Sequence, residues 1–161
     1  MLAGAALIAV ALGLSYRRAA PAGGGLPKRV GDLALSGPVQ SGPGAISQIS
    51  GLHGTSIAIK NAYIGQYAGP SGRAMLWVSE SSSEEDARAL LEAMDRKMPG
   101  NDAFGNRVQT SVAGQAVFRV EGGGMINYYY RLGTRVFWVG YAGSGDGAEV
   151  LSRFIAAFSD R

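Results

Sequence analysis

The sequence contains no cysteine and a single histidine, His53. Without cysteine the chain cannot form a disulfide, a thiolate metal site, a c-type haem attachment or a lipid anchor on cysteine. With one histidine, a stable zinc or haem site would have to be built from carboxylates or methionines, and no Ser-His-Asp arrangement can be argued from spacing. We therefore expect no metal, no cofactor and no enzyme activity, and we interpret His53 as a capping or hydrogen-bonding residue.

Charged residues are also few, at 17% of the chain. The formal net charge of +3 comes from the part of the chain before residue 30, where Arg17, Arg18, Lys28 and Arg29 lie. The rest of the chain has 11 Lys and Arg against 12 Asp and Glu, a net charge of −1. A nucleic-acid groove needs clustered positive charge, so we expect no nucleic acid among the partners.

The one long apolar run is at the start of the chain, where residues 1–16 carry no charged side chain and two arginines follow. Such a segment is either a membrane span or a signal peptide. It lacks a basic beginning, and the arginines separate it from the small residues around Pro21, so we expect a retained transmembrane anchor over residues 1–17. At about 24 Å as a helix it is shorter than the ~30 Å hydrocarbon core.

Small residues recur every four positions in this segment, at Ala5, Ala9 and Gly13. On a helix they would form one narrow face, which lets a second transmembrane helix approach closely. We therefore predict partner helix packing along this face. The alternative is that alanine and glycine are simply frequent in this chain.

After the anchor, residues 18–29 contain two prolines and three consecutive glycines, which predicts a flexible linker. Residues 30–161 then form one globular domain. Its clearest helix lies within residues 81–100, where Ser81 or Ser82 with an acid three positions on makes a capping box and Pro99 ends the helix. A second amphipathic helix lies within residues 145–161, capped by Asp146.

Alternating apolar residues predict strands over residues 55–69, 73–81, 114–122 and 125–143. Residues 31–44 are interpreted as mostly loop, residues 45–52 as a short helix, and residues 101–111 as a connector with one short strand. The predicted fold class is α+β, with the N-terminal transmembrane helix followed by one antiparallel sheet of 5–6 strands packed with two amphipathic helices.

The predicted hairpin at residues 125–143 holds six aromatic side chains. Alternation places Tyr128 and Tyr130 on one face and Tyr129 on the other, and the returning strand, which carries Trp138, is aromatic on both faces as well. A sheet with one face in water should carry polar residues at alternate positions. Either helices cover both faces, or these four aromatic residues form a surface for a partner or a ligand.

The order of these elements, closing in the helix "LSRFIAAF", resembles the α+β sandwich of the PsbP-like and Mog1-like accessory proteins of photosynthesis. The segments "LPKRVGDLAL" and "GLHG" and the spacing of Tyr67, Leu76 and Trp77 also look like an uncharacterised class of membrane-anchored or exported bacterial domains. The resemblance covers residues 26–158. It implies a non-catalytic accessory domain and transfers no functional residue.

We therefore expect a non-catalytic accessory or assembly subunit of a larger bacterial membrane complex, respiratory or photosynthetic, in contact with membrane lipid and with integral membrane subunits. The alternative is a membrane-tethered domain that binds a small ligand in an aromatic pocket formed by the hairpin with Tyr63, Tyr67 and Trp77. The expected location is the bacterial inner membrane as a single-pass protein. Its domain would be periplasmic, although the arginines that follow the anchor favour the cytoplasmic side.

Overall fold

The computed structural model describes residues 25–53 and 58–159, and over these residues it contains eight strands, three α-helices and one short 3-10 helix. The strands are β1 (Arg29–Val30), β2 (Leu33–Ser41), β3 (Asn61–Gly69), β4 (Gly72–Glu80), β5 (Gly105–Val112), β6 (Gln115–Gly122), β7 (Met125–Leu132) and β8 (Arg135–Gly143). The helices are α2 (Pro43–His53), α3 (Glu84–Lys97) and α4 (Gly147–Ser159), with the 3-10 helix η1 (Met98–Gly100) after α3.

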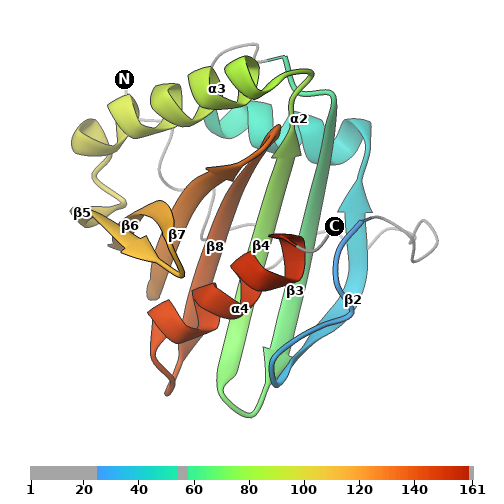
Figure 1. Ribbon diagram of the computed structural model, residues 1–161, viewed down its shortest axis with the longest axis vertical. Helices are drawn as coiled ribbons and strands as arrows, with labels where there is room; N and C mark the ends of the chain where they lie inside the picture. Colours follow the sequence, from blue (N-terminus) through green and yellow to red (C-terminus); the bar gives the residue numbers. More distant parts are fainter. Residues whose placement is uncertain (1–24, 54–57, 160–161) are drawn as a thin grey trace.

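All eight strands form one antiparallel sheet in the order β1-β2-β3-β4-β8-β7-β6-β5. The central pair joins β4 to β8, which are distant in sequence, and short hairpins make most of the remaining pairs. The sheet is strongly curved, with α4 crossing one face and α2 and α3 on the other (Figure 1). Both faces are therefore covered by helices over part of their area.

On the α4 face the core is aromatic and aliphatic. Phe154 of α4 packs edge-on against Tyr67 with ring centroids 5.2 Å apart, and Phe158 packs against Phe137 at 4.9 Å. The large apolar side chains that recur at helical spacing in α4 are all buried, which confirms the amphipathic pattern of this helix; they are Val150, Leu151, Phe154, Ile155 and Phe158. The amide of Ala148 donates to the Asp146 carboxylate at 2.9 Å, as expected for a capping residue.

On the opposite face, α3 packs against β7 and β8, and its buried residues are Ala87, Leu90 and Met94. The cap of this helix differs from the prediction by one or two residues. Ser83 is the N-cap, and its hydroxyl oxygen accepts a hydrogen bond from the Asp86 amide at 3.0 Å. Ser81 cannot serve because it is buried at the end of β4, where its amide donates to the Thr134 carbonyl.

The predicted fold class was wrong in its number of elements. The sheet has eight strands instead of five or six, and three α-helices pack against it instead of two. The segment interpreted as mostly loop forms β2, and the connector expected to hold one short strand contains most of β5. Pairing with β3 and β6 stabilises these sequences, whose own apolar alternation is weak.

The predicted transmembrane helix falls on residues 1–17, which lie outside the described residues, as does most of the predicted linker. Among the helices that the structure does describe, none is long and apolar enough to span a membrane.

Candidate functional site

The residues predicted to form a partner or ligand surface lie inside the fold. Tyr128, Tyr129 and Tyr130 are at most 3% exposed, and Trp138 is partly buried. The reason is that α4 covers the first and third tyrosines while α3 covers Tyr129 and Trp138. The four residues therefore build two cores back to back and do not form a surface open to a partner. The predicted packing face of Ala5, Ala9 and Gly13 lies outside the described residues.

Tyr129 is the centre of the α3 core. Its ring stacks on Phe118 and on Trp138, with centroids 5.0 and 5.4 Å apart. Its hydroxyl donates to Asp95 of α3 at 2.7 Å, and burial is the main reason that its pKa is raised. Arg107 of β5 binds the same carboxylate with two hydrogen bonds of 2.6 and 2.7 Å. This network fixes α3 to the sheet.

The aromatic pocket predicted from Tyr63, Tyr67 and Trp77 is not formed. In the antiparallel register Tyr63 pairs with Val78 and Tyr67 with Ala74, so both tyrosines face α4, whereas Trp77 faces the other side. Tyr67 is also fully buried, and its hydroxyl donates to the Pro27 carbonyl at 2.9 Å. These three residues therefore do not converge on one ligand.

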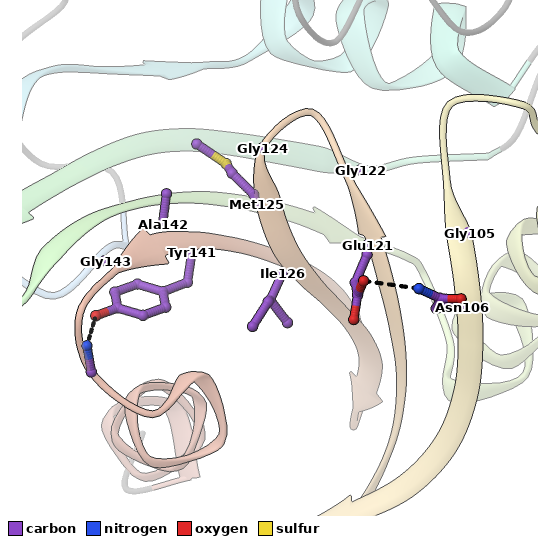
Figure 2. Close-up of a pocket in the computed structure, with 11 residues that line it drawn as sticks. Gly105, Asn106, Glu121, Gly122, Gly124, Met125, Ile126, Tyr141, Ala142 and Gly143 are labelled. Carbon is purple, nitrogen blue, oxygen red and sulfur yellow. Dashed lines mark hydrogen bonds between the residues drawn. The ribbon is translucent and has the colours of Figure 1, made fainter.

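The structure instead contains a hollow of about 610 Å³ at the end of the sheet near the start of α4. It is bordered by the beginning of β5, the turn between β6 and β7, and the end of β8. The residues that line it are Gly105, Asn106, Glu121, Gly122, Gly124, Met125, Ile126, Tyr141, Ala142, Gly143 and Gly145. Figure 2 shows Tyr141, Ile126 and Glu121 on the side of the sheet that carries α4, with Met125 pointing the other way.

A chain of polar groups forms one wall of this hollow. The Glu121 carboxylate accepts a hydrogen bond from the Asn106 amide at 2.9 Å and one from the Arg119 guanidinium at 2.6 Å. These two interactions, Asn106 first, lower the pKa of the Glu121 carboxyl below its ordinary value. Tyr128 lies next along the same face, and burial raises its pKa. Its hydroxyl is packed closely against the start of α4, where a Cβ added at Gly147 would be only 2.9 Å from it.

The opposite wall is mostly backbone. The Tyr141 hydroxyl donates to the Ser71 carbonyl at 2.6 Å and accepts a hydrogen bond from the Gly145 amide at 3.1 Å. At Gly143 an added Cβ would collide with that same carbonyl oxygen, so only glycine fits there. The wall can therefore offer peptide groups to a ligand at close range, with the Tyr141 ring beside them.

The sequence contains one signal for this site, the three consecutive glycines at residues 122–124. Their conformational freedom predicts a bulge or a hairpin connection. The structure confirms the connection, because Gly123 and Gly124 have positive φ in the β6–β7 turn. What the pattern does not reveal is that the curvature of the sheet brings this turn beside β5 and the end of β8.

No metal centre can be assigned in the part of the chain that the structure describes, where no group of three or more His, Asp or Glu side chains is close enough to hold an ion. The three acids at the start of α3, Glu84, Glu85 and Asp86, are exposed in its first turn, where they complement the helix dipole.

Comparisons with known proteins add little. No protein-family model and no curated protein sequence matches the chain. Among solved structures, the extracellular domain of PknH from Mycobacterium tuberculosis is similar with a TM-score of 0.47 and 10% sequence identity, over 80% of this chain and 83% of that one. A likeness this loose carries no inference, and the resemblance to PsbP-like and Mog1-like proteins stays a prediction.

Proposed function

We propose that this protein is a non-catalytic binding domain that holds a small hydroxyl-bearing ligand, of the size of a mono- or disaccharide, in the hollow beside the β6–β7 turn. The observation that carries the proposal is the hollow itself. Its volume of about 610 Å³ lies within the range of small-molecule sites, roughly 300–1,000 Å³. It also combines an apolar surface with a few polar groups, as such sites do.

The polar groups favour a ligand that donates hydrogen bonds. Each oxygen of the Glu121 carboxylate already accepts one hydrogen bond, from Arg119 or from Asn106, and each has a lone pair left for a hydroxyl. On the opposite wall, Gly143 and Gly145 let a ligand approach the backbone without side chains in the way. A polyol can therefore satisfy several acceptors at once.

Charge and shape narrow the ligand class further. The ion pair between Arg119 and Glu121 balances the single carboxylate in the wall, which favours a neutral ligand over an anion. Ile126, which is partly exposed, provides apolar surface against which the carbon face of a sugar ring can lie (Figure 2). This proposal keeps the ligand-binding alternative drawn from the sequence but assigns it to other residues.

The accessory-subunit hypothesis stays a prediction, as does the periplasmic location. The accessory-subunit hypothesis depended on residues 1–17, which lie outside the described residues, and on tyrosines that are buried. No contact among the described residues favours it over ligand binding. Protease treatment of intact spheroplasts would test the location, because a protected domain would indicate the cytoplasmic side.

Isothermal titration calorimetry with a panel of neutral mono- and disaccharides tests the binding proposal. Gly105 lines the hollow, and a Cβ added there meets no atom within 4 Å, so Gly105→Leu fills the hollow without straining the strand. Gly44→Leu is the matched control, because Gly44 has equal free space but lies in α2, away from the hollow.

We expect at least one saccharide to bind the unaltered protein, Gly105→Leu to weaken that binding by about tenfold or more, and Gly44→Leu to leave it unchanged. Glu121→Gln should weaken it as well, because the carboxylate is the stronger acceptor. Absence of binding across the panel, or equal binding by the two leucine variants, would contradict the proposal.

A further inference from the structure

β5 is a long edge strand with a free side. It ends the strand order, and within the described part of the chain β6 is its one strand partner. Seven of its eight residues are exposed, and Val108, at 49%, is the exposed large hydrophobic residue of the described chain. At the other end of the sheet the edge strand β1 has two residues only and pairs with the beginning of β2.

The usual devices that block a sheet edge do not occur along the regular part of β5, residues 108–112. This segment contains no lysine, proline or acidic residue. The irregular register lies before it, between Gly105 and Val108. Arg107 is the nearest charge, and its guanidinium is held by Asp95 of α3. The edge is therefore open to another strand.

The turn after β5 determines which backbone groups point outward. Ala113 and Gly114 both have positive φ, as in a two-residue type I′ hairpin, so Val112 and Gln115 form a hydrogen-bonded pair. The alternation of an antiparallel ladder then directs the amide and carbonyl groups of Val112, Thr110 and Val108 toward β6. Those of Gln109 and Ser111 point away from the sheet.

From this pattern we propose that two copies of the chain associate through β5, antiparallel and with Thr110 on the two-fold axis. Only this register pairs the whole regular segment with itself. Gln109 then lies opposite Ser111 of the second copy, and each such pair contributes two backbone hydrogen bonds. On the α4 face, Val108 lies opposite Val112 of the second copy, and Thr110 lies opposite its own symmetry mate.

The self-complementarity of this register is the reason for choosing a second copy over another partner. Apolar residues meet apolar residues, threonine meets threonine, and all outward backbone groups within the segment are used. The two Arg107 side chains lie about 20 Å apart along the strands, so like charges do not repel. Because a five-residue edge is a small contact, the dimer should be weak, with a micromolar-to-millimolar dissociation constant.

Sedimentation velocity of the full chain over a range of concentrations tests the association. Thr110 is exposed, so Thr110→Asp and Thr110→Lys should fold normally, as circular dichroism would verify. Each variant alone places two like charges opposite each other across the axis and should raise the dissociation constant by about tenfold or more. An equimolar mixture of the two should dimerise at least as well as the unaltered protein.

Cross-linking tests the register independently of affinity. The chain has no cysteine, so Thr110→Cys introduces a single thiol that can form a disulfide only between copies. The control is Ser47→Cys, at an exposed position of α2. We expect the Thr110→Cys protein to form the disulfide dimer much faster. Equal rates for the two cysteine variants, a protein that is monomeric at every concentration, or dimers unaffected by either charge at position 110 would each overturn the proposal.

Discussion

Replacing Asp95 by alanine tests whether the polar network under α3 stabilises the fold. Asp95 accepts one hydrogen bond from the buried Tyr129 hydroxyl and two from the Arg107 guanidinium. Without the carboxylate, the hydroxyl of Tyr129, a residue that is 0% exposed, loses the acceptor of its hydrogen bond, which costs about 1–3 kcal/mol. The ion pair with Arg107 is partly exposed and contributes about 0.5–1 kcal/mol. Together these terms predict that Asp95→Ala lowers the free energy of unfolding by about 1.5–4 kcal/mol.

Urea denaturation followed by tryptophan fluorescence measures this loss, and a double-mutant cycle isolates the hydrogen bond. Tyr129→Phe alone removes the hydroxyl but keeps the ring stack, and should lower the free energy of unfolding by about 1.5–2 kcal/mol. The double variant should lose less than the two single losses combined, by about 1.5 kcal/mol.

Glu92→Ala is the control on the same helix. Glu92 pairs with Arg96 at 4.0 Å, and both side chains are largely exposed, so its loss should stay within about 0.5 kcal/mol. A coupling energy below about 0.3 kcal/mol between positions 95 and 129 would refute the reasoning, because the two groups would then not be interacting in the folded protein.

Three further predictions follow from the packing and the charges. Burial acts to raise the pKa of Asp95, but hydrogen bonds from Arg107 and Tyr129 hold it below its ordinary value. The carboxylate therefore stabilises the fold fully above the unfolded pKa of about 4, and this contribution is lost as the pH falls through the folded pKa. The stability difference between Asp95→Ala and the unaltered protein should shrink in urea titrations at pH 3 and below, and a constant difference would contradict this. Phe154→Ala removes a ring that is 0% exposed and should lower the free energy of unfolding by about 3–5 kcal/mol, measured in the same titration. Gly69→Ala places a Cβ against the Asp32 carbonyl oxygen and should lower the thermal unfolding midpoint. The control Gly44→Ala, in open space on α2, should leave the midpoint unchanged or raise it. Equal midpoints for the two variants would argue against the close approach of the Gly69 and Asp32 backbones.

The sequence predicted well those elements whose own pattern is strong. The apolar stripes of α3 and α4 appear at helical spacing. α4 buries its whole stripe, whereas α3 buries Ala87, Leu90 and Met94 but leaves Leu91 partly exposed. The alternation in residues 125–143 predicted the β7–β8 hairpin and raised the possibility that helices cover both of its faces, which is what the structure shows.

The elements that the sequence did not reveal depend on partners distant along the chain. β5 has two apolar side chains, Val108 and Val112, and most of it lies in the segment interpreted as a connector with one short strand; its full length comes from pairing with β6. The hollow depends on the curvature of the sheet, which brings Asn106 of β5 to Glu121 of β6 and sets both opposite Tyr141. Local periodicity contains no information about that curvature.

The most direct test of the binding proposal is a two-dimensional ¹H–¹⁵N spectrum of the protein recorded during titration with the best-binding saccharide of the panel. The amides of the glycines that line the hollow report on it without any mutation; they are Gly105, Gly122, Gly124, Gly143 and Gly145. We predict that these resonances move in a saturable manner, while those of Gly44, Gly100 and Gly133, elsewhere on the fold, stay in place. Saturable shifts that spare the first group, or no shifts at saturating ligand, would contradict the proposal that the hollow is the binding site.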